Sequence, residues 1–116
     1  MARVDDFKRI RDMLEYARKA ARVSRGRTRA DLDNDEVFVL AATRAVEVIG
    51  EAATRVSAQA RGQYPQIPWP KITGMRNRLV HGYDQVDLDV LWKTLSQEIG
   101  PLMAELEKIL PPEPSA

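Results

Sequence analysis

Apolar residues recur every three or four positions along most of this chain, which is the spacing of one face of an α-helix. The first segment with this pattern covers residues 4 to about 23, where the charged residues take the opposite face. A polar run then ends at Asn34, and either Asp33 or Asn34 can cap the helix that follows. That second helix is predicted over residues 35 to about 61.

The second predicted helix carries a broad apolar stripe, wide enough to contact more than one neighbour. The stripe consists of Val37, Leu40, Ala41, Ala45, Val48, Ile49, Ala52 and Val56. Gly50 lies within it and predicts a tight crossing or a bend, because glycine inside a helix costs up to about 1 kcal/mol relative to alanine. Glu51 is polar although it lies in the stripe. Its partner is an arginine of the later motif, Arg76 or Arg78, or else Arg55 one turn along the same helix.

Prolines and glycines divide the middle of the chain. They predict an extended loop over residues 62 to 69, because each proline disfavours helix in the residue before it. A short third helix is predicted over residues 70 to 81, and Gly82 suits the left-handed position that commonly follows a helix end. Both tryptophans, Trp69 and Trp92, are expected in the core because neither lies in a charged run.

A fourth helix begins after Asp84 or Asp87, either of which can cap it. Pro101 should kink or split this helix, because proline lacks the backbone donor that a helix interior requires. No segment alternates with period two for long enough to predict a strand. The predicted fold class is all-α, an up-down bundle of four or five helices, with one domain over residues 1–110 and a proline-rich tail over 111–116.

The composition narrows the class of protein. A chain of 116 residues suits one domain, and its hydrophobic share of 44% and charged share of 30% are typical of globular proteins. The longest apolar run, residues 37–42, is far shorter than the roughly 20 residues that span a bilayer. The first residues lack the apolar core of a secretory signal. We therefore expect a cytoplasmic protein that does not enter a membrane.

Cysteine is absent and histidine occurs once, which excludes disulfides and argues against an ordinary zinc site. The composition does not rule out a Mg²⁺ site formed by carboxylates, and no cofactor is predicted. The net charge of +1 conceals an asymmetry, because residues 1–30 hold 10 of the 18 basic side chains against 4 acids. A basic first segment could bind phosphate, or it could be a solvated helix face and loop.

Candidate chemistry gathers in the segment Arg76-Asn77-Arg78-Leu79-Val80-His81-Gly82-Tyr83. The imidazole of His81 is the only side chain whose ordinary pKa, about 6.5, allows ready proton exchange near neutrality. The guanidinium of Arg76 has a fork of donors that matches phosphate oxygens. On an ideal helix the two side chains would be about 140° apart. They converge if the arginine reaches round, if the helix unwinds at Gly82, or if they face each other across a dimer.

Four segments of the chain follow one another in a recognisable order. They are Ile49-Gly50-Glu51-Ala52, then Tyr64-Pro65-Gln66-Ile67-Pro68-Trp69, then the stretch from Arg76 to Tyr83, and finally Val86-Asp87 with Trp92. Their order and spacing closely resemble the HepT-like branch of the HEPN proteins, small all-α domains marked by R-x4-6-H. The motif stands here as R-N-x3-H-x-Y, and the resemblance covers roughly residues 5 to 109.

The resemblance implies a homodimeric ribonuclease toxin whose two motifs meet in a shared cleft. It also implies an antitoxin, a minimal nucleotidyltransferase that adenylylates the motif tyrosine. Carried over residue by residue, the catalytic pair falls on Arg76 and His81, the polar residue of the motif on Asn77 and the modified tyrosine on Tyr83. Glu51 and Arg78 are candidates for supporting roles or for binding RNA.

The chemistry of RNA cleavage is an independent check on this resemblance. Cleavage without a metal needs a base, an acid and a cation beside the phosphate. One chain supplies one histidine, so a catalytic site in which His81 fills both proton-transfer roles requires a homodimer. Alternatives stay open: His81 could bind the last carbonyls of its helix, Arg78 could be a phosphate contact or surface, and Tyr83 could be a buried anchor.

Two competing functions follow from these alternatives. In one, the chain is a catalytically silent helical module that serves a nucleotidyltransferase as its substrate or nucleotide-binding subunit, with Arg76 and His81 gripping phosphate. In the other, it is a purely structural dimerisation domain.

Overall fold

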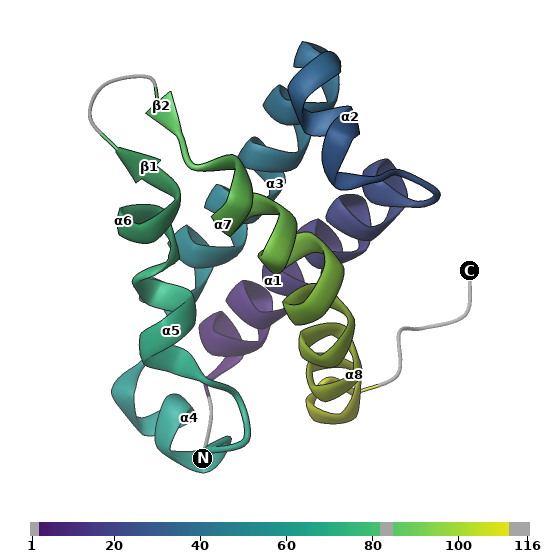
Figure 1. The fold of residues 1–116 in the computed structure, drawn as a ribbon. Helices are drawn as coiled ribbons and strands as arrows, with labels where there is room; N and C mark the ends of the chain where they lie inside the picture. The colour runs from purple at the N-terminus through teal and green to yellow at the C-terminus, as the bar shows by residue number, and fades with distance from the viewer. Residues whose placement is uncertain (1–2, 82–84, 112–116) are drawn as a thin grey trace.

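Helices make up nearly all the regular structure in residues 3–81 and 85–111, the part of the chain that the computed structural model describes (Figure 1). The helices are α1 (Val4–Ser24), α2 (Arg29–Asn34), α3 (Glu36–Thr54), α4 (Ala58–Gln63), α5 (Trp69–Thr73), α6 (Met75–Leu79), α7 (Leu88–Lys93), the π-helix η1 (Thr94–Glu98) and α8 (Ile99–Ile109). Two short strands, β1 (Val80–His81) and β2 (Gln85–Val86), pair antiparallel. The all-α class is confirmed, although several predicted helices are divided into shorter ones.

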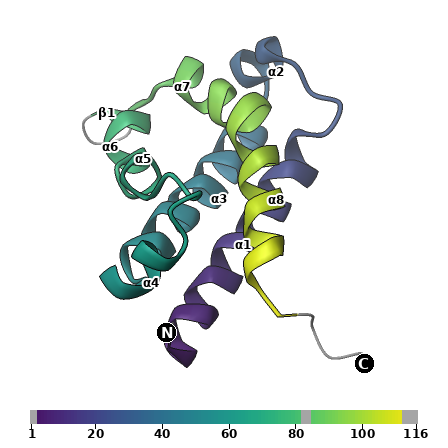
Figure 2. The same ribbon diagram turned by 90° about the horizontal axis from the view of Figure 1, so that it is seen from below.

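The core forms where α1, α3 and α8 pack together, with α1 contacting both of the others (Figures 1 and 2). The apolar faces predicted from the spacing supply its centre, and the most deeply buried large side chains include Ile10, Met13, Val46, Ile49 and Leu106. Helices α5 and α6 lie against α3. The same long helix therefore supports both the core and the segment that carries the motif.

The second predicted helix is shorter than expected, because α3 ends at Thr54 and α4 begins at Ala58. The break is stabilised by Asp6 of α1, which lies buried beside it. The backbone N–H and the hydroxyl of Ser57 both donate to the Asp6 carboxylate at 2.8 Å. Burial raises the pKa of the Asp6 carboxyl, but these hydrogen bonds outweigh it and leave the pKa below its usual value. The prediction of one helix to residue 61 is wrong for this reason.

The predicted cap of the long helix is also wrong. Asp33 and Asn34 belong to the short helix α2, which the polar composition concealed, and Asp33 pairs with Arg29. The residue that caps α3 is Asp35, whose carboxylate accepts the backbone N–H of Phe38 at 3.1 Å.

The third predicted helix is two helices joined at a turn. The chain turns at Gly74, where a Cβ would come within 3.1 Å of the Pro70 carbonyl oxygen. Helix α6 then ends at Leu79, two residues earlier than predicted, because the Leu79 carbonyl accepts the N–H of Asp87 at 2.7 Å as the chain enters β1. The predicted loop over 62–69 is shorter at both ends, and Gly82 lies outside the described residues.

The fourth predicted helix is capped by Asp87, whose carboxylate accepts the N–H groups of Asp89 and Val90, each at 3.1 Å. The other predicted cap, Asp84, lies outside the described residues. Regular α-helical bonding gives way to the π-helix η1 just before Pro101, as expected where a backbone donor is missing.

Both tryptophans contribute to the core, Trp69 fully and Trp92 in part. Of the predicted tail, the structure describes Pro111 alone, which is exposed. Within the described residues, no helix has the length and apolar character needed to cross a bilayer.

Candidate active site

A groove of about 410 Å³ lies where α3 meets α5 and α6. Three residues singled out from the sequence, Glu51, Arg76 and Asn77, line it together. The other lining residues are Arg44, Glu47, Gly50, Thr54 and Thr73. The structure thus places Arg76 and Asn77 against α3, the helix that carries Glu51.

Gly50 sets how closely the motif segment approaches α3. A Cβ built at this position would lie 3.1 Å from the Ile72 carbonyl oxygen and 3.9 Å from the Cβ of Met75. The first distance is tighter than ordinary contact, and the atom concerned belongs to the backbone. The predicted tight crossing is therefore confirmed, and the absent side chain lets α5 and α6 pack beside the groove.

Arg76 meets an acid in this groove, but the acid is Glu47 rather than Glu51. Its Nε atom lies 3.6 Å from Oε2 of Glu47, one helical turn before Glu51. The Arg76 side chain is 74% exposed and that of Glu47 is 26% exposed. The guanidinium thus contacts Glu47 at one edge and is otherwise open to solvent, which leaves donors accessible to a phosphate.

The partners predicted for Glu51 are not found. Within the described residues, Glu51 is exposed and forms no ion pair with Arg76, Arg78 or Arg55. Glu47 was missed in the sequence, although it lies four positions before Glu51 and hence on the same helical face. Arg44, which was missed as well, extends that face by a further turn.

Arg78 serves the opposite side of α6. Its Nη2 atom donates to the Lys71 carbonyl oxygen at 2.9 Å, so the side chain ties α6 to the preceding helix. It does not line the groove of Arg76. Arg78 therefore braces the motif segment in this structure, and its role in binding RNA stays a prediction.

His81 lies on β1 rather than on a helix, with its backbone opposite Gln85. The angle of about 140° expected on an ideal helix therefore does not apply. One of the three ways in which Arg76 and His81 could converge was an unwinding of the helix at Gly82. The helix does end here, but it ends at Leu79, before Gly82. The His81 side chain and all of Tyr83 lie outside the described part of the structure, so their placement beside Arg76 stays a prediction.

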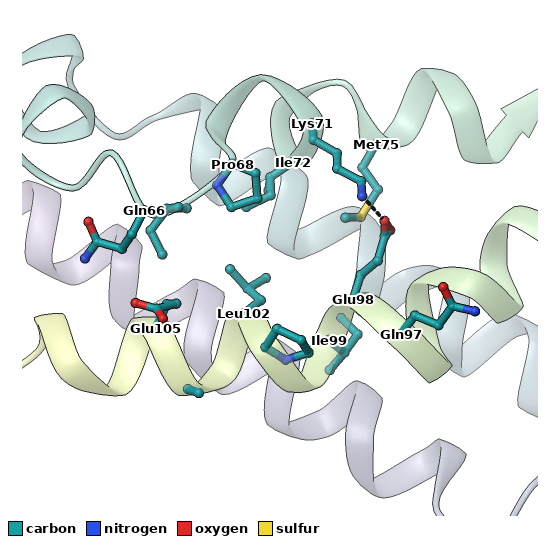
Figure 3. A pocket seen from close by; sticks show the side chains of 13 residues that line it. Gln66, Pro68, Lys71, Ile72, Met75, Gln97, Glu98, Ile99, Leu102 and Glu105 are labelled. Carbon is teal, nitrogen blue, oxygen red and sulfur yellow. Dashed lines mark ion pairs between the residues drawn. The ribbon is translucent and has the colours of Figure 1, made fainter.

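A second cleft, of about 450 Å³, separates α5 from η1 and α8 (Figure 3). Its walls are mainly apolar, with Ile72 and Leu102 among them, and Figure 3 shows Lys71 and Glu98 facing each other at one end as an ion pair. Burial raises the pKa of the Glu98 carboxyl. The hydrogen bond from Lys71 and the positive charge of that residue outweigh the effect of burial, so the pKa of Glu98 lies below its usual value. The lining of this cleft holds one cation, Lys71, against Glu98 and Glu105, whereas two arginines line the groove of Arg76 beside its two glutamates. The cleft is therefore less suited to a phosphate than that groove.

Among the described residues, no group of three or more histidine or acidic side chains lies close enough together to hold a metal ion. Glu47 and Glu51 are the carboxylates nearest the motif in the groove.

The family follows from comparison with known proteins. The sequence model described as "Ribonuclease HepT-like" matches residues 13–109, which span most of α1 through α8. This chain belongs to the ribonuclease HepT-like family. The resemblance drawn from the motif is confirmed, and the groove of Arg76 and Asn77 is where this HepT-like protein holds the first part of that motif.

Named relatives agree with the family. "Putative RNase MJ1216" of Methanocaldococcus jannaschii is 34% identical over 99 residues, which cover 85% of this chain and 82% of the relative. "Probable ribonuclease HepT" of Thermococcus cleftensis is 39% identical over 75 residues, which cover 65% of this chain and 68% of the relative. No solved structure matches this HepT-like chain significantly.

Proposed function

We propose that this HepT-like protein is an endoribonuclease toxin that cleaves RNA without a metal ion. The observation that carries the proposal is the setting of Arg76, a largely exposed guanidinium held at a groove by Glu47. It stands five residues before the only histidine, in a family described as ribonucleases. A cation fixed beside a possible proton carrier is what cleavage at a phosphodiester requires.

In the proposed reaction the ribose 2′-oxygen attacks the adjacent phosphorus. One copy of His81, in its neutral form, takes the proton of the 2′-hydroxyl. Arg76 stabilises the negative charge that develops on the phosphate oxygens, and the side-chain amide of Asn77 is a further donor in the same groove. The 5′-oxygen leaves with a proton from an imidazolium, giving a 2′,3′-cyclic phosphate and a 5′-hydroxyl.

Two copies of His81 are needed if one acts as base while the other acts as acid, so the proposal includes a homodimer. An apolar surface on α3 supports it. Val37 and Leu40 are 75% and 63% exposed, and Ala41 beside them is exposed as well. They continue the outward face of the helix that lines the groove. Light scattering should report twice the mass of one chain, and Leu40→Arg should lower both that mass and RNA cleavage.

Control by a nucleotidyltransferase completes the proposal. Tyr83 is two residues beyond His81, and attaching AMP to its hydroxyl would place negative charge and an adenine ring near the proposed shared cleft of the dimer. Both would oppose the entry of RNA phosphate. Such a toxin and its antitoxin would act in the cytoplasm, where they meet RNA.

Expression of this chain alone tests the proposed function. We expect growth arrest, which His81→Ala should abolish and a nucleotidyltransferase encoded beside this gene should neutralise. If expression of a folded wild-type chain leaves growth and cellular RNA unchanged, the proposed toxin function is wrong, and the chain is either a silent subunit of a nucleotidyltransferase or a structural dimerisation domain.

A further inference from the structure

A stripe of basic side chains runs along the outward face of α1, opposite the face that packs into the core. The stripe is defined by Lys8, Arg11, Arg18 and Arg22, all exposed. Their spacing of three, seven and four residues keeps them on one side of a helix, whereas Ile10, Met13 and Ala17 are buried on the other. From Lys8 to Arg22 the helix rises about 21 Å.

The acids near this stripe are already paired. Glu15 lies 3.5 Å from the ammonium of Lys19, and Asp12 lies 3.8 Å from the guanidinium of Arg9. Arg18 of the stripe reaches Glu107 of α8 at 3.6 Å. The other three basic residues of the stripe form no ion pair with any described residue. Positive charge is therefore left uncompensated on this face.

The charge is also segregated from the remainder of the protein. Residues 1–30 carry 10 basic side chains against 4 acids, whereas residues 31–116 carry 8 basic against 13 acids. Helix α1 itself holds six basic side chains against four acids, so it carries a net positive charge that attracts a polyanion.

Hollowed surface connects this stripe with the groove of Arg76. The groove at the motif shares Arg44 and Glu51 with a neighbouring groove of about 410 Å³ between α3 and α1. That second groove shares Asp12 and Glu15 with a third, of about 520 Å³, which runs along the stripe itself. The three grooves therefore adjoin one another along a path from the motif across α3 to α1.

We infer that the α1 stripe binds the sugar–phosphate backbone of the substrate RNA, away from the bond that is cleaved. The inference rests on the proposed function, because it extends the substrate site of a ribonuclease. Such contacts are independent of base sequence and weaken with salt, since each one releases a counterion from the nucleic acid. They also require an RNA long enough to reach from Arg76 to α1, so they confer a preference for longer substrates.

A polyanion fits this surface better than a protein partner does. The outward positions from Lys8 to Arg22 carry only charged side chains, without the apolar or aromatic centre typical of protein interfaces. A row of cations on one helix face matches a backbone that bears one negative charge per nucleotide.

The test compares the affinity of the full chain for single-stranded 2′-O-methyl RNA of two lengths, about 5 and about 30 nucleotides, chosen to bracket common site sizes. Such RNA lacks the attacking hydroxyl and stays intact during the measurement. The test variant is Arg11→Ala/Arg22→Ala. The matched control, Lys93→Ala/Lys108→Ala, removes the same charge from exposed residues of α7 and α8.

Wild-type protein should bind the longer RNA more tightly, and the test variant should lose that preference. With two phosphate contacts gone, the slope of log Kd against log salt should fall by about 1.4, and Kd for the longer RNA should rise about tenfold at 0.1 M salt. The control should keep the wild-type slope.

A test variant that binds the longer RNA as wild type does would overturn the inference, while RNA cleavage by the wild type would leave the proposed function intact. If that variant instead fails only to copurify with a coexpressed nucleotidyltransferase, the stripe is a protein interface and the inference is wrong. A wild-type chain that neither binds nor cleaves RNA contradicts both.

Discussion

Arg76 and Glu47 face each other across the groove between α6 and α3, with Nε and Oε2 3.6 Å apart. Neither residue could be paired with the other from the sequence, because they lie on different helices whose rotation is set by packing. The contact holds the arginine of the motif at the groove while most of its guanidinium stays exposed. Glu47 therefore positions Arg76 but also adds negative charge where phosphate would bind.

Glu47→Gln separates these two effects. We expect it to lower kcat by less than about tenfold, because an exposed ion pair is worth only about 0.2 to 1 kcal/mol. It should also lower KM for RNA, since one negative charge leaves the groove. Steady-state kinetics measure both constants. Glu51→Gln is the matched control, because it removes the same charge from the same groove without freeing Arg76, and it should lower KM alone. Identical kinetics for the two variants would contradict a positioning role for Glu47.

Gly50→Val should push α5 and α6 away from α3. A Cβ at this position already meets the Ile72 carbonyl oxygen at 3.1 Å, and overpacking of this kind typically costs about 1 to 3 kcal/mol. Chemical denaturation measures the loss of stability, and RNA cleavage should fall because Arg76 shifts with α6. Gly62→Val is the control, since nothing lies within 4 Å of its Cβ position. Equal effects of the two substitutions would argue against a close crossing at Gly50.

Asp6→Asn tests the link between α1 and the start of α4. The folded protein holds the pKa of Asp6 below its unfolded value, so this carboxylate stabilises the fold above about pH 4, the ordinary pKa of an aspartate. That stability is lost as pH falls through the lowered pKa of the folded state. The variant should be about 1 to 3 kcal/mol less stable than wild type at pH 7, and the difference should shrink in acid. Exposed Asp5→Asn is the control. A difference that stays constant down to pH 3 would exclude the charged form as the cause.

The long helices could be predicted because their apolar spacing persists over many turns, so the pattern alone places α1 and the start of α3. The positions at which the predicted helices are interrupted could not be predicted in this way. The break before α4 depends on hydrogen bonds from Ser57 to Asp6, which stands 51 residues earlier in the chain. Helix α2 could not be predicted, because its exposed polar residues show no periodic spacing of apolar positions.

The candidate site follows the same division. Arg76 and Asn77 were identified together because they are adjacent in a motif, and the structure places both in one groove. The choice of Glu47 over Glu51 depends on the rotation of α3 about the Gly50 crossing, which no local pattern records. Arg78 has the same charge as Arg76, but it turns toward Lys71 because it lies two positions further along α6.

Tyr83→Phe tests the proposed control by adenylylation. Coexpression with a neighbouring nucleotidyltransferase should add one or more AMP units to the wild-type chain, which intact mass spectrometry detects. The variant lacks the acceptor oxygen and should stay unmodified and toxic. Tyr64→Phe, the control, retains Tyr83 and should be modified as wild type is. An unmodified Tyr83 in a neutralised complex would mean that the antitoxin inhibits by binding alone.

The most direct test of the central claim is RNA cleavage by purified wild-type and His81→Ala protein in excess EDTA. The wild type should cleave RNA and leave 2′,3′-cyclic phosphate ends or their hydrolysis products. His81→Ala should be slower by a factor of about 10² to 10⁴, the usual worth of general acid–base catalysis, while circular dichroism and light scattering show an unchanged fold and assembly. Cleavage that stops in EDTA and returns with Mg²⁺, or a folded His81→Ala protein that cleaves at the wild-type rate, would contradict the account.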